Sequence, residues 1–279
     1  MRVAYADAAG IRTRFLSAGE GEPLFLVHGV GASADSFARN VRSIGAAREA
    51  RLHAVAPDLI GHGFSAAGLC PVPAPHAQMS RQLLALADAL GVGRFSLAGT
   101  SYGALVAAQA ALDAPGRVRR LVLIGSGSVF HPPEAQARTL RAAAANGRKA
   151  MENPDFDTCR RRLEALVHDA ACIPEALVHA QLNQYALPDR VAEYDRTIAG
   201  ALAAAAAPGP TVHDRLGELE MPVRIIVGRD DPRADWREHE KAAARMRPGT
   251  RVSVYDRCGH LPYLEHATRF EAELVEFLS

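Results

Sequence analysis

Three kinds of segment are scarce in this sequence: long apolar runs, clusters of basic residues and paired cysteines. No apolar stretch approaches the roughly 20 residues that a membrane-spanning helix needs, so association with a membrane is not expected. The densest basic run is Arg160–Arg162, and with 32 basic and 31 acidic residues the net charge is only +1. A run this short is typical of a solvated helix face, so nucleic acid is not an expected partner.

The cysteines are scattered along the chain and form no recognisable ligand set. Cys70, Cys159, Cys172 and Cys258 include no C-x-x-C pair and no spacing typical of a zinc site. Reduced thiols in a reducing compartment are expected, although the sequence leaves room for one disulfide. The first ten residues, MRVAYADAAG, lack the charged-then-apolar order of a signal peptide. A cytoplasmic location is therefore expected.

The sequence does contain a regular alternation of short apolar runs and helical patterns. Its 279 residues are 48% hydrophobic and 23% charged, a balance typical of a globular protein with a substantial core. Runs typical of buried strands occur at Val3–Ala6, Ile11–Ser17, Leu24–His28, His53–Pro57, Phe95–Ala98, Leu121–Ile124, Val223–Val227 and Val252–Tyr255. The first two flank a turn and predict a hairpin. Helical patterns such as Gln78–Leu90 and Tyr102–Asp113 separate the others, which predicts an α/β fold with a doubly wound sheet.

The alternation stops between about Phe130 and Val212. This Ala-, Arg- and Glu-rich stretch opens at His131–Pro133, closes near Pro208–Pro210 and contains no β-rich run. Three or four helices, inserted between two strands of the sheet as a cap, are expected here. The predicted organisation is a core built from residues 1–129 and 213–279, with a helical cap at residues 130–212.

A G-x-S-x-G motif, GTSYG at residues 99–103, comes directly after one predicted strand and directly before a helical run. This pattern is typical of a tight strand-to-helix turn that holds a serine in a strained backbone conformation. Gly99 and Gly103 lack Cβ atoms, which lets the strand and the helix approach closely around Ser101. Free N–H groups at the helix N-terminus favour developing negative charge. Ser101 is therefore predicted to be a nucleophile rather than an ordinary helix cap.

Candidates for the base and the acid follow in the order that this motif requires. A serine hydroxyl needs a base to become nucleophilic, and the base needs an acid that orients it. After this elbow motif the chain order is serine, then carboxylate, then histidine. Asp230 and Asp231 follow the predicted strand Val223–Val227, and His260 follows the last predicted strand. A Ser–His–Asp triad that contains one of these two carboxylates is therefore predicted.

Together these motifs resemble the α/β-hydrolase fold family over nearly the whole chain. The resemblance implies a mostly parallel, eight-stranded sheet with helices on both faces and an inserted helical cap. The family's G-x-x-D loop, counted from Gly228, implies Asp231 as the acid, with Asp230 as the alternative. The family's other location for the acid follows the strand Leu121–Ile124, where this chain has no carboxylate. His260 occupies the family's position for the base.

The segment HGVG at residues 28–31 resembles the oxyanion loop of the same family. The resemblance implies that the main-chain N–H groups of Val30 and Tyr102 form the oxyanion hole. Two such donors in a site that excludes water can each stabilise an acyl-transfer transition state by about 3–4 kcal/mol. His28 is expected to brace the loop rather than to act as an acid or a base.

Within the family, the sequence is most similar to the meta-cleavage-product C–C hydrolases and related small esterases, in its cap segment Leu163–Leu182 and its C-G-H motif. Those C–C hydrolases usually have a cap arginine that binds the substrate carboxylate, an Asn before the serine and a Trp after the histidine. This chain has Gln181, Thr100 and Leu261 instead. Glutamine does not replace the bidentate guanidinium, so a neutral substrate, or a carboxylate bound elsewhere, is expected. The candidate substrate-binding residues are Phe130, Gln181 and Leu261.

Three functions agree with this sequence. The first is hydrolysis of a small, largely apolar ester or lactone, and the second is C–C bond hydrolysis of a vinylogous diketone. The third is a small-molecule receptor on a hydrolase scaffold, against which the complete triad argues. Serine at the elbow argues against the chemistry of the family's haloalkane dehalogenases and epoxide hydrolases, which use Asp there. A small-molecule substrate, no cofactor and no metal are expected, and a homodimer agrees with the sequence without being required by it.

Overall fold

An eight-stranded sheet forms the centre of the protein, in a computed structural model that describes residues 1–68 and 74–279. Its strands are β1 (Arg2–Ala8), β2 (Ile11–Ala18), β3 (Glu22–Val27), β4 (Leu52–Pro57), β5 (Phe95–Thr100), β6 (Val118–Ile124), β7 (Val223–Gly228) and β8 (Arg251–Tyr255). They lie in the order β1-β2-β4-β3-β5-β6-β7-β8. The pairs β1–β2 and β2–β4 are antiparallel and all other pairs are parallel. The predicted mostly parallel, eight-stranded sheet is therefore confirmed.

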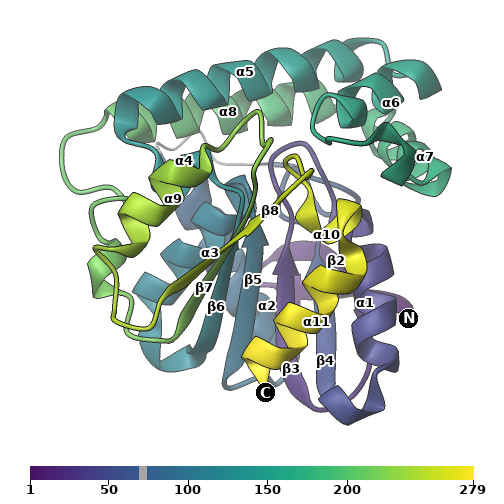
Figure 1. Ribbon diagram of the computed structural model, residues 1–279. Coiled ribbons are helices and arrows are strands. Elements are labelled where there is room, and N and C mark those ends of the chain that lie inside the picture. The colour runs from purple at the N-terminus through teal and green to yellow at the C-terminus, as the bar shows by residue number, and fades with distance from the viewer. Residues whose placement is uncertain (69–73) are drawn as a thin grey trace.

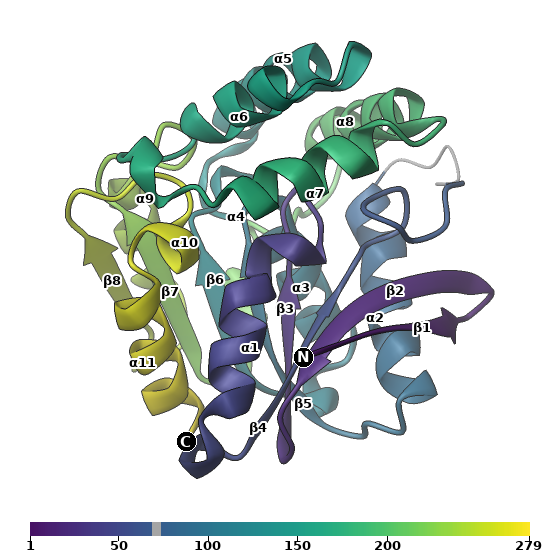
Figure 2. The ribbon, with the colours of Figure 1, turned by 90° about the vertical axis from the view of Figure 1, so that its right-hand side faces the viewer.

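Helices cover both faces of this sheet (Figures 1 and 2). Helices α1 and α11 contact each other on one face, and α2, α3 and α9 pack on the other. The helices of the core are α1 (Ala38–Ala46), α2 (Pro75–Ala89), α3 (Tyr102–Asp113), α4 (Gly127–Phe130), α9 (Trp236–Ala243), α10 (Pro262–Glu265) and α11 (Ala267–Leu278). Short 3-10 turns lie at Ala34–Phe37, Arg48–Ala50, Pro115–Arg117, Ala170–Cys172 and Leu216–Glu218.

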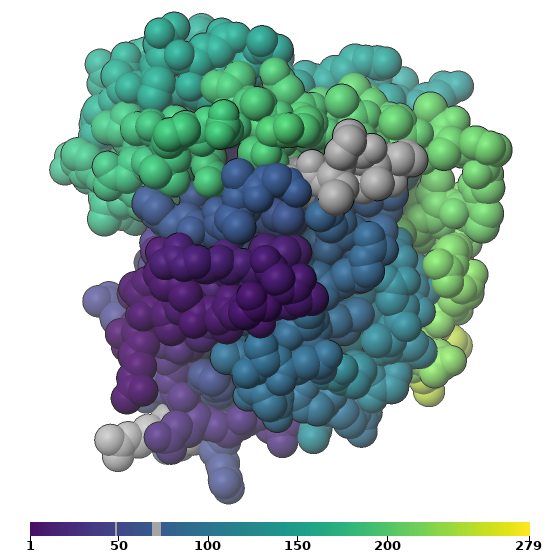
Figure 3. Space-filling view, turned by 180° about the vertical axis from the view of Figure 1, so that it is seen from behind, coloured from purple at the N-terminus to yellow at the C-terminus, as the bar shows by residue number. Residues whose placement is uncertain are grey.

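The segment between β6 and β7 is helical and lies across one end of the sheet (Figures 1 and 2). It contains α5 (Pro133–Glu152), α6 (Phe156–Glu164), α7 (Glu175–Tyr185) and α8 (Arg190–Ala206). Helices α5 and α8 pack along each other, and α6 contacts both α5 and α7. In the space-filling view from behind, these helices extend across the top of the core (Figure 3). They stand over the carboxyl ends of the parallel strands, where ligands of open α/β sheets bind.

The burial of each strand follows its place in the sheet. Every residue of β5 is buried, because this strand lies between two parallel neighbours and under helices on both faces. The outer strand β1 instead alternates between exposed and less exposed residues. Among the described helices, none combines the length and the apolar character that crossing a membrane requires. Cys159, Cys172 and Cys258 carry free thiols, and Cys70 lies outside the described residues.

Candidate active site

Ser101 sits in a strained turn between β5 and α3. Its φ of 55° and ψ of −122° are unfavourable for a residue with a Cβ and persist only where the surroundings enforce them. A Cβ on Gly99 would lie 2.3 Å from the Gly103 carbonyl oxygen, and one on Gly103 would lie 2.3 Å from that of His28. Both glycines are therefore required by close backbone approach. The turn presents the Ser101 side chain to a cavity between the core and the cap.

The loop after β3 lies directly beside this serine. A Cβ on Gly29 would be 3.0 Å from the Ser101 Cβ. His28 braces the loop from inside: its Nε2 accepts a hydrogen bond from the Leu59 N–H (3.0 Å), so its Nδ1 carries the proton and donates to the Gly29 carbonyl (2.8 Å). Burial lowers the pKa of His28 to about 4. A neutral histidine with both ring nitrogens occupied supports the loop and cannot serve as the base.

Val30 and Tyr102, the residues expected to supply the oxyanion hole, line the same cavity as Ser101. Tyr102 is the first residue of α3, and an N–H at that position has no partner within its own helix. Within the described part of the chain, the Val30 N–H has no hydrogen-bond partner either. Both amides are therefore available to an oxygen atom bound beside Ser101.

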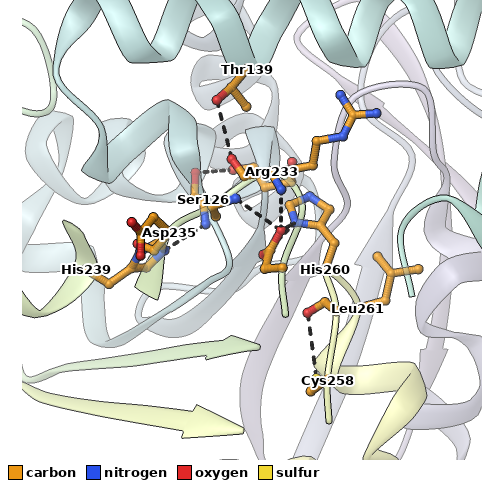
Figure 4. A network of polar contacts seen from close by, with 12 residues as sticks. Ser126, Thr139, Arg233, Asp235, His239, Cys258, His260 and Leu261 are labelled. Atoms are coloured by element: carbon orange, nitrogen blue, oxygen red, sulfur yellow. Dashed lines mark hydrogen bonds and ion pairs between the residues drawn. The ribbon is translucent and has the colours of Figure 1, made fainter. Parts of the chain in front are cut away.

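His260, labelled in Figure 4, follows β8. It contacts the carboxylate of Asp231, which follows β7. The distances from His260 Nδ1 to the two carboxylate oxygens are 2.9 and 2.8 Å. The Asp231 side chain is fully buried, and its Oδ1 also accepts from the N–H groups of Arg233 (2.7 Å) and Ala234 (3.1 Å). These bonds fix the position of the carboxylate, and its contact with Nδ1 holds the imidazole in one orientation.

The neighbouring carboxylate, Asp230, points elsewhere. Its Oδ2 lies 2.9 Å from Nδ1 of His168 on the cap, and both side chains are substantially exposed, at 45% and 37%. The structure thus separates two acids that are adjacent in the sequence. It brings Asp231 to His260 and leaves Asp230 at the border between core and cap.

Gly125, directly after β6, makes room for this pairing and was not singled out from the sequence. Its φ is +40°, and a Cβ there would lie 2.9 Å from Oδ2 of Asp231 and 3.6 Å from Nδ1 of His260. The sequence showed only that this loop has no carboxylate. Residue 125 must also lack a side chain, because the Asp231 carboxylate from the loop after β7 occupies that space.

Glu265 links the histidine loop to the cap. Its Oε1 accepts from the Gly259 N–H (2.9 Å), and its Oε2 accepts from the His168 N–H (2.6 Å). The His260 N–H donates to the Leu166 carbonyl, also on the cap (2.6 Å). The position of the imidazole therefore depends on contacts with the cap as well as on Asp231.

Of the three residues expected to bind substrate, only Leu261 lines the cavity. Phe130 is fully buried in α4, with its ring 4.3 Å (between centroids) from that of His239, and is part of the core. Gln181 is also buried and does not reach the cavity. With its amide nitrogen donating to the Cys159 carbonyl (3.2 Å), its oxygen accepts from Nη1 of Arg162 (2.8 Å).

The cavity contains charge that the sequence did not predict. Arg162 and Arg233 both line it, together with Asn146, Thr139 and Tyr194. The run Arg160–Arg162 was expected to be a solvated helix face, and for Arg162 this is wrong, because its exposed fraction is 7%. Successive helical residues are rotated by about 100°, so one residue of such a run can point inward while its neighbour Arg161 is exposed.

A second cavity adjoins the first. The two share Tyr102, Ser128 and Leu140 in their walls, and the second continues under the segment 207–213 that follows α8. A ligand bound at Ser101 therefore has room on more than one side. Among the described residues, no three His, Cys, Asp or Glu side chains are grouped so that they could hold a metal ion.

Comparison with known proteins agrees with this architecture. The chain is 30% identical to 2-hydroxy-6-oxononadienedioate/2-hydroxy-6-oxononatrienedioate hydrolase of Burkholderia vietnamiensis, over 98% of this chain and 92% of that protein. Its fold is similar to that of 2-hydroxy-6-oxo-6-phenylhexa-2,4-dienoate hydrolase from Rhodococcus (TM-score 0.76, 23% identity, 99% and 98% covered). It is equally similar to that of an esterase from Thermogutta terrifontis (TM-score 0.76, 24% identity, 100% and 98% covered).

These relatives confirm the predicted resemblance to meta-cleavage-product hydrolases and the predicted hydrolase class. A sequence model described as the alpha/beta hydrolase fold matches residues 22–267, which include the oxyanion loop, the elbow, the acid loop and the histidine. The chain therefore belongs to the α/β-hydrolase fold family.

Proposed function

We propose that this protein is a serine hydrolase in which Ser101 is the nucleophile, His260 the general base and Asp231 the residue that orients the base. One observation carries the proposal. The buried His260–Asp231 pair and the strained Ser101 turn meet at one cavity, beside two amides that are free to bind an oxyanion. An ordinary helix cap would need none of these partners.

The reaction follows from these positions. Ser101 Oγ attacks the substrate carbonyl and gives its proton to Nε2 of His260, because Nδ1 faces Asp231. The N–H groups of Val30 and Tyr102 stabilise the negative charge that develops on the carbonyl oxygen. His260 then protonates the leaving group as the bond breaks. Water, deprotonated by the same imidazole, releases the acyl group from Ser101.

Two substrate classes are candidates, and a different observation favours each. Thr100 and Leu261 stand where C–C hydrolases of this family usually have Asn and Trp, which favours a small ester or lactone. The similarity to a 2-hydroxy-6-oxononadienedioate hydrolase over almost the whole chain favours C–C cleavage of a vinylogous diketone. Both reactions pass through a tetrahedral oxyanion, so the same residues serve either.

The remaining expectations concern the setting of the reaction. We propose a small-molecule substrate because Ser101 and His260 lie in a cavity between the core and the cap. A cytoplasmic location is supported by the unpaired thiols of Cys159, Cys172 and Cys258, which agree with a reducing compartment.

The test is labelling by a fluorophosphonate probe together with kinetics. Wild-type protein should be labelled, and Ser101→Ala should not, while the control Ser43→Ala, at an exposed serine of α1, should be labelled normally. Ser101→Ala and His260→Ala should each lower kcat about 10⁴-fold or more. A loss below tenfold would contradict the mechanism. The two substrate classes are distinguished by comparing kcat/KM for p-nitrophenyl esters with kcat/KM for a ring-fission dienoate. A clear preference for the dienoate would favour C–C cleavage over ester hydrolysis.

A further inference from the structure

Two arginines line the cavity at Ser101. Arg162 comes from α6 on the cap, and Arg233 comes from the loop after β7. Of the described residues that line this cavity, none is acidic, and neither arginine forms an ion pair with any of the described residues. A guanidinium removed from water is costly unless an anion and hydrogen bonds compensate it.

Arg162 is held in place by hydrogen bonds, but its Nε has no partner among the described residues. Its Nη2 donates to the Val30 carbonyl (3.3 Å), and its Nη1 donates to Gln181 (2.8 Å). Its Nε is buried and has no partner among the described residues. Tyr194 also interacts with this guanidinium, and since a guanidinium has five N–H donors, these contacts do not use all of them.

The oxyanion loop is shaped around this guanidinium. Gly31 has a φ of +69°, and a Cβ there would lie 2.8 Å from Nη2 of Arg162. Arg162 therefore stands next to the loop whose Val30 amide faces the reacting carbonyl. Arg162, Val30 and Ser101 thus line the same cavity.

Arg233 approaches from the side of the triad. It lies two residues after Asp231, and its side chain extends from the acid loop past the His260 ring (Figure 4). Its Nη1 is buried without a partner among the described residues. Burial lowers the pKa of Arg233, and the positive charge of Arg162 acts in the same direction, while Tyr194 and Asp231 act in the opposite one. The two cations are thus close enough to repel each other, and an anion bound near them would relieve this repulsion.

A purely structural role does not account for both side chains. Arg162 stacks over the Tyr185 ring (5.7 Å to the centroid), which explains its aliphatic and planar packing but not its unused donors. The guanidinium of Arg233 donates no hydrogen bond to a described residue, so the fold gains no polar contact from it. What the two share is the cavity at Ser101.

We infer that the substrate carries a carboxylate, and that Arg162, assisted by Arg233, binds it beside Ser101. This inference rests on the proposed function and narrows its substrate class to acyl compounds with an anionic substituent. Arg162 takes the part that a cap arginine plays in similar hydrolases, but it does so from a different position of the cap. Gln181, which occupies the usual position in the sequence, instead holds Arg162 through its side-chain oxygen. Paired N–H groups of arginine match a carboxylate in geometry as well as in charge.

The test compares two esters that differ only in charge: p-nitrophenyl pentanoate and the p-nitrophenyl hemiester of glutarate, in which a carboxylate replaces the terminal methyl group. The wild-type enzyme should have the higher kcat/KM for the hemiester. Arg162→Gln should lower the ratio of hemiester to pentanoate kcat/KM about tenfold or more. Arg233→Gln should lower the same ratio by a smaller factor. Arg161→Gln, an exposed neighbour on the same helix, should leave it unchanged.

A binding measurement separates this inference from the proposed reaction. Glutarate should bind to Ser101→Ala in calorimetry, and the additional change Arg162→Gln should weaken that binding about tenfold. If both esters are hydrolysed through Ser101 but the ratio is the same in wild type and Arg162→Gln, the carboxylate site is refuted and the hydrolase stands. If glutarate binds through Arg162 but neither ester is turned over, the hydrolase proposal fails and the anion site stands.

Discussion

Replacing Gly125 by alanine should damage catalysis more than it damages the fold. A Cβ at this position would lie 2.9 Å from Oδ2 of Asp231, whereas ordinary contacts begin near 3.4 Å. The carboxylate must therefore move by about 0.5 Å, and the imidazole that it orients must follow. Misplacing reacting groups by about 1 Å can cost about 100-fold, and complete loss of the orienting acid costs about 10⁴-fold. We expect kcat to fall about 10- to 100-fold with little change in KM.

The free energy of unfolding of this variant should fall by about as much as that of a control variant at a second glycine, Gly91. Gly125 has a φ of +40°, and an alanine in the left-handed region costs roughly 1 kcal/mol or more. Gly91 has a φ of +69°, and a Cβ at this position would have no atom within 4 Å. Gly91→Ala therefore introduces the backbone strain without disturbing the triad. Urea unfolding should show a loss of about 1–2 kcal/mol for both variants, while kcat should fall only for Gly125→Ala. A folded Gly125→Ala enzyme with kcat within twofold of wild type would refute the reasoning.

Two further predictions concern the histidines and the loop that carries the base. Glu265→Ala removes the acceptor for the Gly259 and His168 N–H groups. Because the His260 loop then loses this attachment to the cap, kcat should fall about tenfold. Steady-state kinetics with the p-nitrophenyl esters measures this, and an unchanged kcat would contradict it. Burial lowers the pKa of both His28 and His239 to about 4. The unfolded chain therefore takes up protons that the folded state does not bind, so the free energy of unfolding should fall as the pH is lowered from about 6.5 toward 4. Urea titrations at successive pH values check this, and a flat profile over that range would contradict it.

The strands and the nucleophile turn followed from local patterns. Each of the eight apolar runs overlaps one of the strands β1 to β8. For the inner strands, such as β5, the reason is that a strand buried on both faces needs a continuous apolar run. The turn at Ser101 is equally local. Gly99 and Gly103 lie within two residues of the serine, so the sequence alone shows that the turn has no Cβ at these two positions.

The sequence alone therefore determined the type of fold and the order of its elements, and it supplied the proposed nucleophile and its two proposed partners in chain order. Only the tertiary structure decided which side chains meet. It placed Asp231 rather than Asp230 on the imidazole, turned Arg162 into the cavity and set Gly125 against the acid. The contacts of Asp231 with His260 and Gly125 join loops from different strands at one edge of the sheet, and Arg162 reaches the cavity from α6 of the cap. Their proximity depends on strand order and on how the cap packs, and neither is encoded in the spacing of neighbouring residues.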